Sequence, residues 1–261
     1  MVEKNTVKTN GIEMDYFSFG EGDKNMVVVP GLNVTSVLNI AEEVAEYFSP
    51  LAQEFKIYVF DRRTNLPSEY STYDMANDTV EVIKNIGIKD IYLYGTSQGG
   101  MISQVIAINN PGLVKKLALA STTSRMSKEA TEKIGHWVDI ACTMDMRALA
   151  NQFGEDIYTK EFCDKHGDSL FQQTLNATED DVKRFKVLAG KIGDFDVYDK
   201  LPSIKCPTYV FGASGDKLFS VEEFDDIANK IGCESYIYDG YSHCMYDEVT
   251  DYIGRLYEFL V

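Results

Sequence analysis

The segment Ile91-Tyr92-Leu93-Tyr94-Gly95-Thr96-Ser97-Gln98-Gly99-Gly100-Met101 is the most informative part of the chain. An apolar run ends at Gly95, a G-x-S-x-G pattern surrounds Ser97, and a helical pattern continues to Ile108. On such a tight strand-to-helix turn, small flanking residues let the serine hydroxyl project from the sheet, and the following helix directs N–H groups toward developing negative charge. The stretch therefore predicts that Ser97 is a nucleophile.

Apolar runs of similar length recur on both sides of this stretch. They cover residues 26–29, 57–60, 117–120, 209–211 and 236–238, and the lack of polar alternation is typical of strands buried on both faces. Helical periodicity lies between most of them, which predicts a doubly wound α/β sheet. The N-terminus differs, because Thr6–Thr9 and Ile12–Phe17 flank Asn10-Gly11, a favoured hairpin turn.

One stretch, residues 124–199, breaks the strand–helix alternation. It contains helical patterns and no convincing strand, and Thr178-x-x-Asp181 has the form of a capping box. It predicts a helical insertion between two strands of the sheet. We therefore expect residues 1–123 and 200–261 to form the core and residues 124–199 to form a helical lid.

A serine nucleophile needs a base, and the chain has three histidines. His136 and His166 lie in the insertion, whereas His243 follows the last predicted strand and so reaches the same sheet edge as Ser97. Asp216 also follows a strand and is the predicted carboxylate that orients His243. The weaker competitors for this role are Asp194, Asp196 and Asp239.

An oxyanion hole needs two N–H donors. The N–H of Gln98, directly after the nucleophile, is the first. The second is expected from the loop after the 26–29 strand, where Leu32 is the choice and Asn33 the alternative.

Together these residues resemble the α/β-hydrolase fold family, in the chain order Ser97, Asp216, His243, and the resemblance is to a small esterase-like member. It extends to Phe60-Asp61-Arg62-Arg63, which is similar to the family's D-x-R loop, and to the re-entry segment Leu201–Pro207. It implies a mostly parallel eight-stranded sheet with an N-terminal hairpin, helices on both faces and a lid after strand six. One departure is Pro30-Gly31, where many relatives have His-Gly.

Composition restricts the partners. Lys plus Arg number 25 against 41 Asp plus Glu, giving a net charge of −16, which disfavours nucleic acid and anionic membrane surfaces. Five dispersed cysteines without a C-x-x-C pair, and no apolar leader, favour a reduced, cytoplasmic location. No nucleotide-binding or metal motif is present, so no cofactor and no metal are expected. We expect a monomer or homodimer acting on a small molecule.

The expected activity is hydrolysis of small, uncharged carboxylic esters through an acyl-enzyme. The substrate pocket is expected to include Asn33 and four lid residues, namely Trp137, Met144, Phe153 and Phe171. For the DRR motif Asp61-Arg62-Arg63, an internal ion pair is favoured over binding of a substrate carboxylate. A buried, unreactive role is favoured for Cys244.

Two alternatives remain. The same three residues serve thioesterases, lactonases, carbon–carbon hydrolases and aminopeptidases, and fold does not choose among them. The acidic pair Glu155-Asp156 would favour an aminopeptidase if it held a substrate amine. The second alternative is a ligand-binding protein of this fold without turnover.

Overall fold

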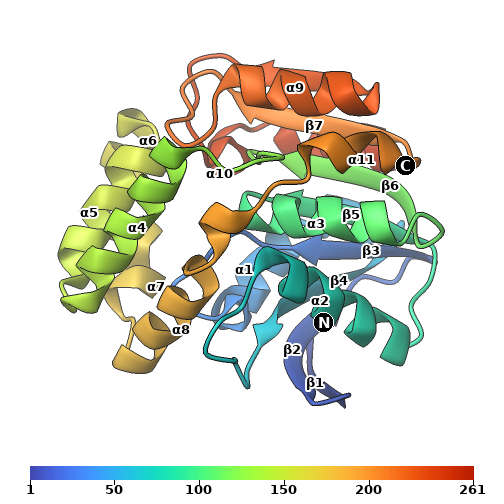
Figure 1. Ribbon diagram of the computed structural model, residues 1–261, viewed down its shortest axis with the longest axis horizontal. Coiled ribbons are helices and arrows are strands. Elements are labelled where there is room, and N and C mark those ends of the chain that lie inside the picture. The colour runs from blue at the N-terminus through green and yellow to red at the C-terminus, as the bar shows by residue number, and fades with distance from the viewer.

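Eight strands form one sheet in the order β1-β2-β4-β3-β5-β6-β7-β8 in the computed structural model, which describes residues 1–261 (Figure 1). From β4 onward in this order the neighbours are parallel, whereas β1, β2 and β4 pair antiparallel. The expected mostly parallel eight-stranded sheet is confirmed. The strands are β1 Glu3–Thr9, β2 Ile12–Phe19, β3 Lys24–Val29, β4 Phe55–Arg63, β5 Ile91–Thr96, β6 Val114–Ala120, β7 Thr208–Ala213 and β8 Glu234–Tyr238.

The N-terminal hairpin forms at the predicted turn. Thr9 pairs with Ile12, and Asn10 and Gly11 between them both have positive φ, 45° and 78°. Two positive φ angles characterise the hairpin turn whose twist matches that of the flanking strands, and Asn-Gly adopts them at low cost.

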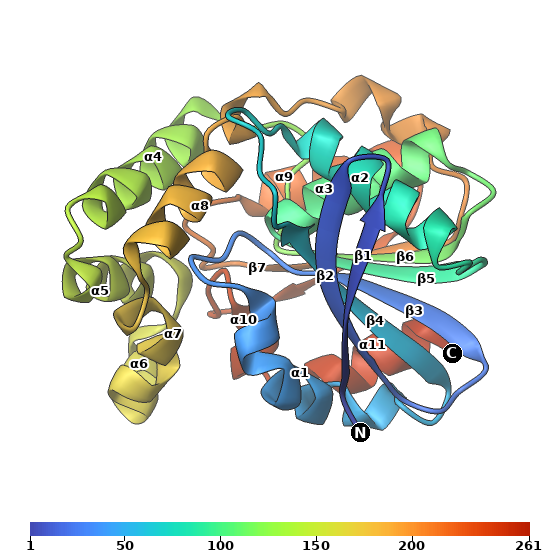
Figure 2. The same ribbon diagram turned by 90° about the horizontal axis from the view of Figure 1, so that it is seen from below.

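Helices cover both faces of the sheet, as Figure 2 shows: α1 and α11 lie on one face, and α2, α3 and α9 on the other. Each group packs a separate apolar core against the sheet. Near the C-terminus the chain forms two separate helices, α10 and α11, because Val249 between them is extended. The bounds are α1 Ala41–Tyr47, α2 Thr72–Asn85, α3 Gln98–Asn109, α9 Val221–Ile231, α10 Met245–Glu248 and α11 Tyr252–Leu260.

Five helices lie between β6 and β7, and Figure 1 shows them beside the sheet at the left of the view. At their neck, the Val197 N–H donates to the Ser124 carbonyl (2.8 Å) and the Met126 N–H to the Phe195 carbonyl (3.0 Å). These bonds join the two ends of the helical insertion. The predicted capping box of Thr178 and Asp181 starts its last helix. The helices are α4 Lys128–Cys142, α5 Met146–Ile157, α6 Lys160–His166, α7 Gln172–Leu175 and α8 Glu179–Ala189.

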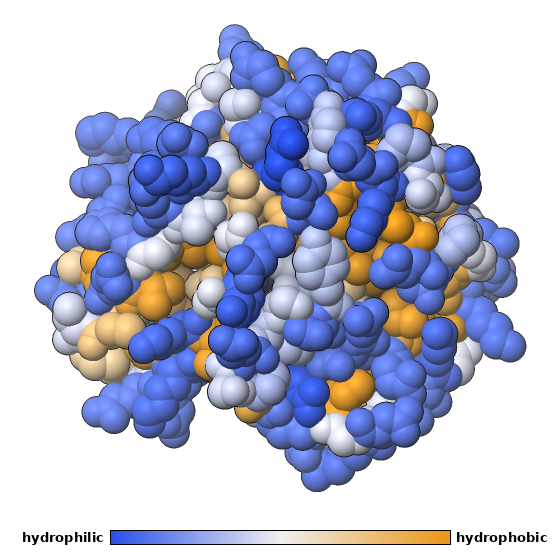
Figure 3. Space-filling model, in the orientation of Figure 1, coloured by the Kyte–Doolittle hydropathy of each residue, from blue (hydrophilic) through white to orange (hydrophobic).

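The insertion does not have a core of its own. Its buried side chains, among them Trp137, Phe185 and Leu188, join the apolar core that α2, α3 and α9 form with the sheet. The surface in the view of Figure 3 is mainly hydrophilic, with apolar side chains visible over the insertion. No helix is both long enough and apolar enough to cross a membrane. Short 3-10 turns cover Val37–Ile40, Ser49–Leu51, Gly167–Phe171, Ile192–Asp194 and Tyr198–Ser203.

Candidate active site

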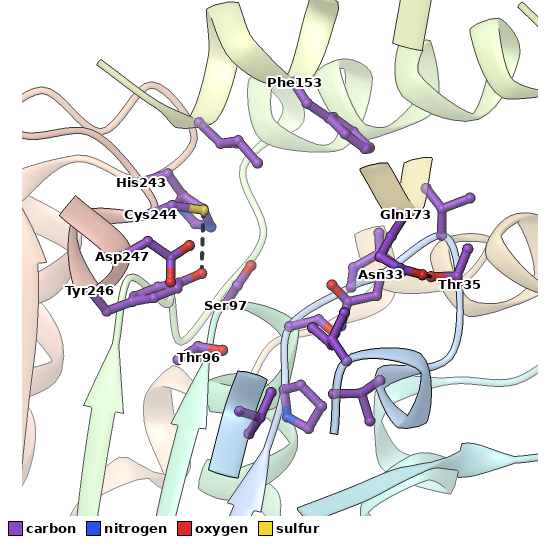
Figure 4. A pocket seen from close by; sticks show the side chains of 18 of the residues that line it. Asn33, Thr35, Thr96, Ser97, Phe153, Gln173, His243, Cys244, Tyr246 and Asp247 are labelled. Atoms are coloured by element: carbon purple, nitrogen blue, oxygen red, sulfur yellow. Dashed lines mark hydrogen bonds between the residues drawn. The ribbon is translucent and has the colours of Figure 1, made fainter. Parts of the chain in front are cut away.

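Ser97 occupies a strained turn between β5 and α3. Its φ of 51° and ψ of −123° lie where residues with a side chain rarely occur, so the surrounding structure must hold it there. The Ser97 N–H donates to the Ala120 carbonyl (2.9 Å), and its own carbonyl accepts from Thr122 Oγ1 (2.8 Å). The Oγ has no hydrogen-bond partner and faces the cavity described below (Figure 4).

Glycines make this turn possible because the chain crosses itself closely. A methyl group on Gly99 would lie 1.9 Å from the Val29 carbonyl oxygen, and one on Gly100 would lie 2.6 Å from the Thr122 side chain. Both distances are far below van der Waals contact. The G-x-S-x-G-G spacing is therefore a steric requirement of the turn.

His243 and Asp216 form a buried pair. His243 Nδ1 lies 2.8 Å from Asp216 Oδ2, and the two side chains are 4% and 0% exposed. Asp216 Oδ1 accepts the N–H groups of Leu218 (2.8 Å) and Phe219 (3.1 Å). With the carboxylate so fixed as an acceptor, the imidazole proton lies on Nδ1 and Nε2 carries the free lone pair.

The loop after β3 lies directly against Ser97. A methyl group on Gly31 would lie 3.2 Å from Ser97 Cβ. The N–H groups of Leu32, Asn33 and Gln98 have no hydrogen-bond partner within the protein. Unpaired donors on two sides of the serine are the arrangement that an oxyanion requires.

Arg62 connects these two sides. Its fully buried guanidinium donates from Nη2 to the Pro30 carbonyl (2.7 Å) and to Gln98 Oε1 (3.4 Å). Burial lowers the pKa of Arg62 to about 10, so it remains charged at neutral pH. Its neighbour Asp61 forms an ion pair with Arg184 of α8. The predicted internal ion pair is thus confirmed, and its partner comes from the insertion.

A cavity of about 490 Å³ opens above Ser97, between the sheet, α1, α10 and the insertion. Ser97 and His243 both line it, and Figure 4 shows His243, Tyr246 and Asp247 on one side and Asn33, Thr35 and Gln173 on the other. Of the expected pocket residues, the structure places four on its wall: Asn33, Trp137, Phe153 and Phe171.

Met144 is a correction. It is 40% exposed, has φ of 62° in the turn between α4 and α5, and does not line the cavity. The reason is local: α4 ends at Cys142, so helical spacing from Trp137 does not extend to Met144.

The acidic pair Glu155-Asp156 is a second correction. Asp156 is buried and accepts Trp137 Nε1 (2.7 Å), Gln152 Nε2 (2.9 Å) and Lys133 Nζ (3.1 Å). Glu155 is exposed, and neither carboxylate lines the cavity. The pair is therefore not a site for a substrate amine.

Sequence reasoning missed four polar residues of the cavity wall. Glu43 and Tyr47 of α1 and Tyr246 and Asp247 of α10 all line the cavity. The sequence signal that could have identified Asp247 is its position four residues after His243, the proposed base. Burial raises the pKa of Cys244 well above its usual value, so this thiol is protonated, and the expected buried role is confirmed.

Comparison with known proteins agrees with this architecture. Residues 24–249 match a family model described as alpha/beta hydrolase fold. Serine hydrolase BPHL of Mus musculus is 21% identical over 97% of this chain and 84% of its own length. The chain superimposes on MGS-M2, an alpha/beta hydrolase from a deep-sea metagenome library, with TM-score 0.87, 18% identity and coverage of 98% and 96%. It also superimposes on an enol-lactonase from Burkholderia xenovorans, with TM-score 0.84 and 19% identity, over 98% of this chain and 99% of the enol-lactonase.

Proposed function

Because this chain belongs to the alpha/beta hydrolase fold family and is a hydrolase, we propose that it cleaves small carboxylic esters that carry no negative charge, through an acyl-enzyme on Ser97. The observation that carries the proposal is the 2.8 Å pairing of His243 Nδ1 with Asp216, with His243 and Ser97 lining one cavity. The absence of any Lys or Arg from the cavity wall argues against an anionic substrate.

The proposed reaction assigns one role to each group. Ser97 Oγ attacks the carbonyl carbon while His243 Nε2 takes its proton, and Asp216 stabilises the imidazolium that forms. His243 returns the proton to the leaving alcohol oxygen. A water molecule then attacks the acyl-enzyme with the same base, releasing the acid and restoring Ser97.

The N–H groups of Gln98 and Leu32 are the proposed donors to the oxyanion, with Asn33 as the alternative to Leu32. Their lack of partners within the protein supports this role, because donors already in place need no reorganisation when charge develops. Arg62 is a proposed positioning residue, since it holds the Pro30 carbonyl and the Gln98 side chain together.

Residues 124–199 are the proposed lid over a core of residues 1–123 and 200–261. Trp137, Phe153 and Phe171 form part of the cavity wall, which supports a role in enclosing the substrate. Enclosure would exclude water and strengthen the electrostatic interactions at the oxyanion.

Covalent labelling with a fluorophosphonate tests the proposal. The expected result is rapid, stoichiometric modification of Ser97, located by peptide mass, with none in Ser97→Ala. A matched control is Ser36→Ala, which also removes a hydroxyl from the cavity wall and should label normally. Absence of labelling in the native protein would instead favour a ligand-binding protein without turnover.

The bond cleaved has rivals with the same chemistry: thioester, lactone, carbon–carbon and aminoacyl amide. The enol-lactonase among the similar structures supports including lactones in the assay panel. Values of kcat/KM for matched substrates of each class rank them. If kcat/KM for another class exceeded that for esters by more than about tenfold, that class would replace esters in the proposal. This ratio corresponds to a difference of about 1.4 kcal/mol in transition-state stabilisation.

A further inference from the structure

The cavity wall has a one-sided charge. Its residues include two carboxylates, Glu43 and Asp247, and no Lys or Arg. The wall is also rich in aromatic rings, among them those of Tyr47, Trp137, Phe153, Tyr158 and Tyr246. Carboxylates and aromatic faces without a protein cation form an environment that attracts a cationic group.

Asp247 is the carboxylate nearest in the chain to the proposed base. It lies in α10, four residues after His243, and lines the same cavity. Many protein atoms lie around it, but the residue is solvent-exposed where it borders the cavity. Figure 4 shows it beside Tyr246, on the same side of the cavity as His243.

Half of this carboxylate has no partner. Oδ2 accepts the hydroxyl of Tyr158 (3.0 Å), whereas Oδ1 accepts no hydrogen bond from the protein, and Asp247 forms no ion pair with Lys, Arg or His. Its neighbour Glu248 differs, because both of its oxygens accept hydrogen bonds from Thr159, the N-cap residue of α6. Asp247 thus keeps a free acceptor directed at the cavity after its structural bond is made.

The surroundings of Asp247 also disfavour its charge. Burial is the main cause that raises the pKa of Asp247 to about 6; the hydrogen bond from Tyr158 acts in the opposite direction, and the nearby charge of Glu248 contributes to the increase. A carboxylate whose ionised form is disfavoured in this way, and which has no counter-ion, is stabilised by a ligand cation. No group of three or more His, Cys, Asp or Glu is arranged to hold a metal ion, so the chemistry fits an organic cation.

We propose that Asp247 binds a substituted ammonium group of the substrate, so that the enzyme prefers esters carrying a positive charge close to the scissile bond. The inference rests on the proposed function and narrows its substrate class. Tyr158 holds the carboxylate in place, and the aromatic rings of the wall contact the alkyl groups of the ammonium ion. Glu43, on α1, adds negative potential to the same cavity.

Isosteric substrate pairs test this inference. Butyrylcholine and tert-butylethyl butyrate differ in charge and hardly in shape, with the cation in the alcohol part. Alanine ethyl ester and ethyl isobutyrate make the same comparison with the cation in the acyl part. The expected result is a cation-to-neutral ratio of kcat/KM of about tenfold or more in at least one pair. The pair that shows it identifies the side of the ester bond that carries the ammonium group.

The diagnostic variant is Asp247→Asn, whose amide oxygen can still accept the Tyr158 hydroxyl. We expect its cation-to-neutral ratio to fall about tenfold, toward unity. Glu46→Gln is the matched control, because Glu46 is an exposed carboxylate of α1 that does not line the cavity, and its ratio should equal that of the native protein. A native ratio near unity in both pairs, or an equal ratio in Asp247→Asn, would overturn the inference.

Binding to protein without the nucleophile separates this inference from the proposed function. Calorimetry of butyrylcholine with Ser97→Ala should show tighter binding than with Ser97→Ala/Asp247→Asn, whatever bond the enzyme cleaves. If Asp247→Asn does not fold, inhibition of the native enzyme by choline, compared with tert-butylethanol, gives the same information. Equal inhibition by the two alcohols would reject a cation site. Hydrolysis that persists in Ser97→Ala would reject only the acyl-enzyme proposal.

Discussion

Arg184 of α8 forms an ion pair with Asp61 at the end of β4, and both side chains are largely buried. Asp61 also accepts Ser36 Oγ (2.6 Å) and the Arg62 N–H (2.7 Å). One turn further along α8, the Leu188 carbonyl accepts Gln98 Nε2 (2.7 Å). The insertion is thus attached to the core beside Ser97 through two polar contacts that share one helix face.

The first prediction concerns this ion pair. Arg184→Gln should lower the free energy of unfolding by about 3 kcal/mol, the lower end of the range for breaking a buried pair, since Asp61 keeps two other donors. Chemical denaturation measures the loss, and a double-mutant cycle with Asp61→Asn isolates the pairwise part. The control is Arg147→Gln in the same insertion, where the Arg147–Asp168 pair is solvent-exposed and its loss should have no measurable effect. Equal effects of the two substitutions would contradict a stabilising contact at Asp61.

The second prediction concerns the three proposed catalytic residues. Ser97→Ala and His243→Ala should each lower kcat for ester hydrolysis by about 10³-fold or more, and Asp216→Asn somewhat less. The double variant of Ser97 and His243 should be scarcely slower than Ser97→Ala, because the residues act as a unit. Circular dichroism and thermal melting check that each variant is folded. Near-native turnover by folded Ser97→Ala would exclude Ser97 as the nucleophile.

The third prediction concerns the glycine that follows the serine turn. Gly99→Ala should destabilise the fold by more than about 3 kcal/mol, because the atoms that the new methyl group would meet are backbone oxygens that cannot move aside. Gly135→Ala is the matched control, since nothing lies within 4 Å of a methyl group there and the position is in α4. It should stabilise the protein by up to about 1 kcal/mol. Urea midpoints of the two variants should therefore move in opposite directions.

Local sequence was sufficient for the sheet and for the placement of Ser97, Asp216 and His243. Parallel strands bring their carboxyl ends to one edge, so a residue placed just after a strand is located once the strands are recognised. The cavity wall was harder to predict. Whether Met144 or Phe153 faces the cavity depends on where α4 ends and how α5 packs, and the partner of Asp61 lies 123 residues away in the chain. Such contacts are set by tertiary packing, which periodicity does not encode.

The fourth prediction concerns the size of the acyl site. Phe153 packs edge-to-face on Trp137, with ring centroids 5.1 Å apart, and both line the cavity. For the native enzyme, kcat/KM should rise by up to about 0.8 kcal/mol per acyl methylene and fall once the cavity is full. Phe153→Ala should move the optimum to longer chains and leave the proposed catalytic residues Ser97, His243 and Asp216 in place. Met144→Ala, which alters a side chain outside the cavity, should keep the native optimum. An unchanged optimum in Phe153→Ala would mean that the acyl chain lies elsewhere.

The fifth prediction is a pH dependence of substrate selectivity. Asp247 attracts an ammonium group only when ionised, and burial raises its pKa to about 6. The cation-to-neutral ratio for butyrylcholine and tert-butylethyl butyrate should therefore be greatest above pH 7 and fall as the pH is lowered through about 6. The charge of choline does not change with pH. The protonation state of His243 affects the hydrolysis of both esters equally, so its effect cancels in the ratio.

Among the titratable groups around Asp247, we expect Asp247 itself to be the main cause of this change in the cation-to-neutral ratio with pH. Burial raises the pKa values of the nearby tyrosines and of Cys244, so they stay uncharged across this range. Both oxygens of Glu248 accept hydrogen bonds from Thr159. Glu43 is the other carboxylate of the cavity wall. These neighbours are Tyr47 and Glu43 of α1, Tyr158 after α5, Cys244, Tyr246 and Glu248 of the α10 region, and Tyr252 of α11. Asp247→Asn should give a lower and nearly flat profile. A profile in this variant that still falls through about pH 6 would assign the selectivity to another group.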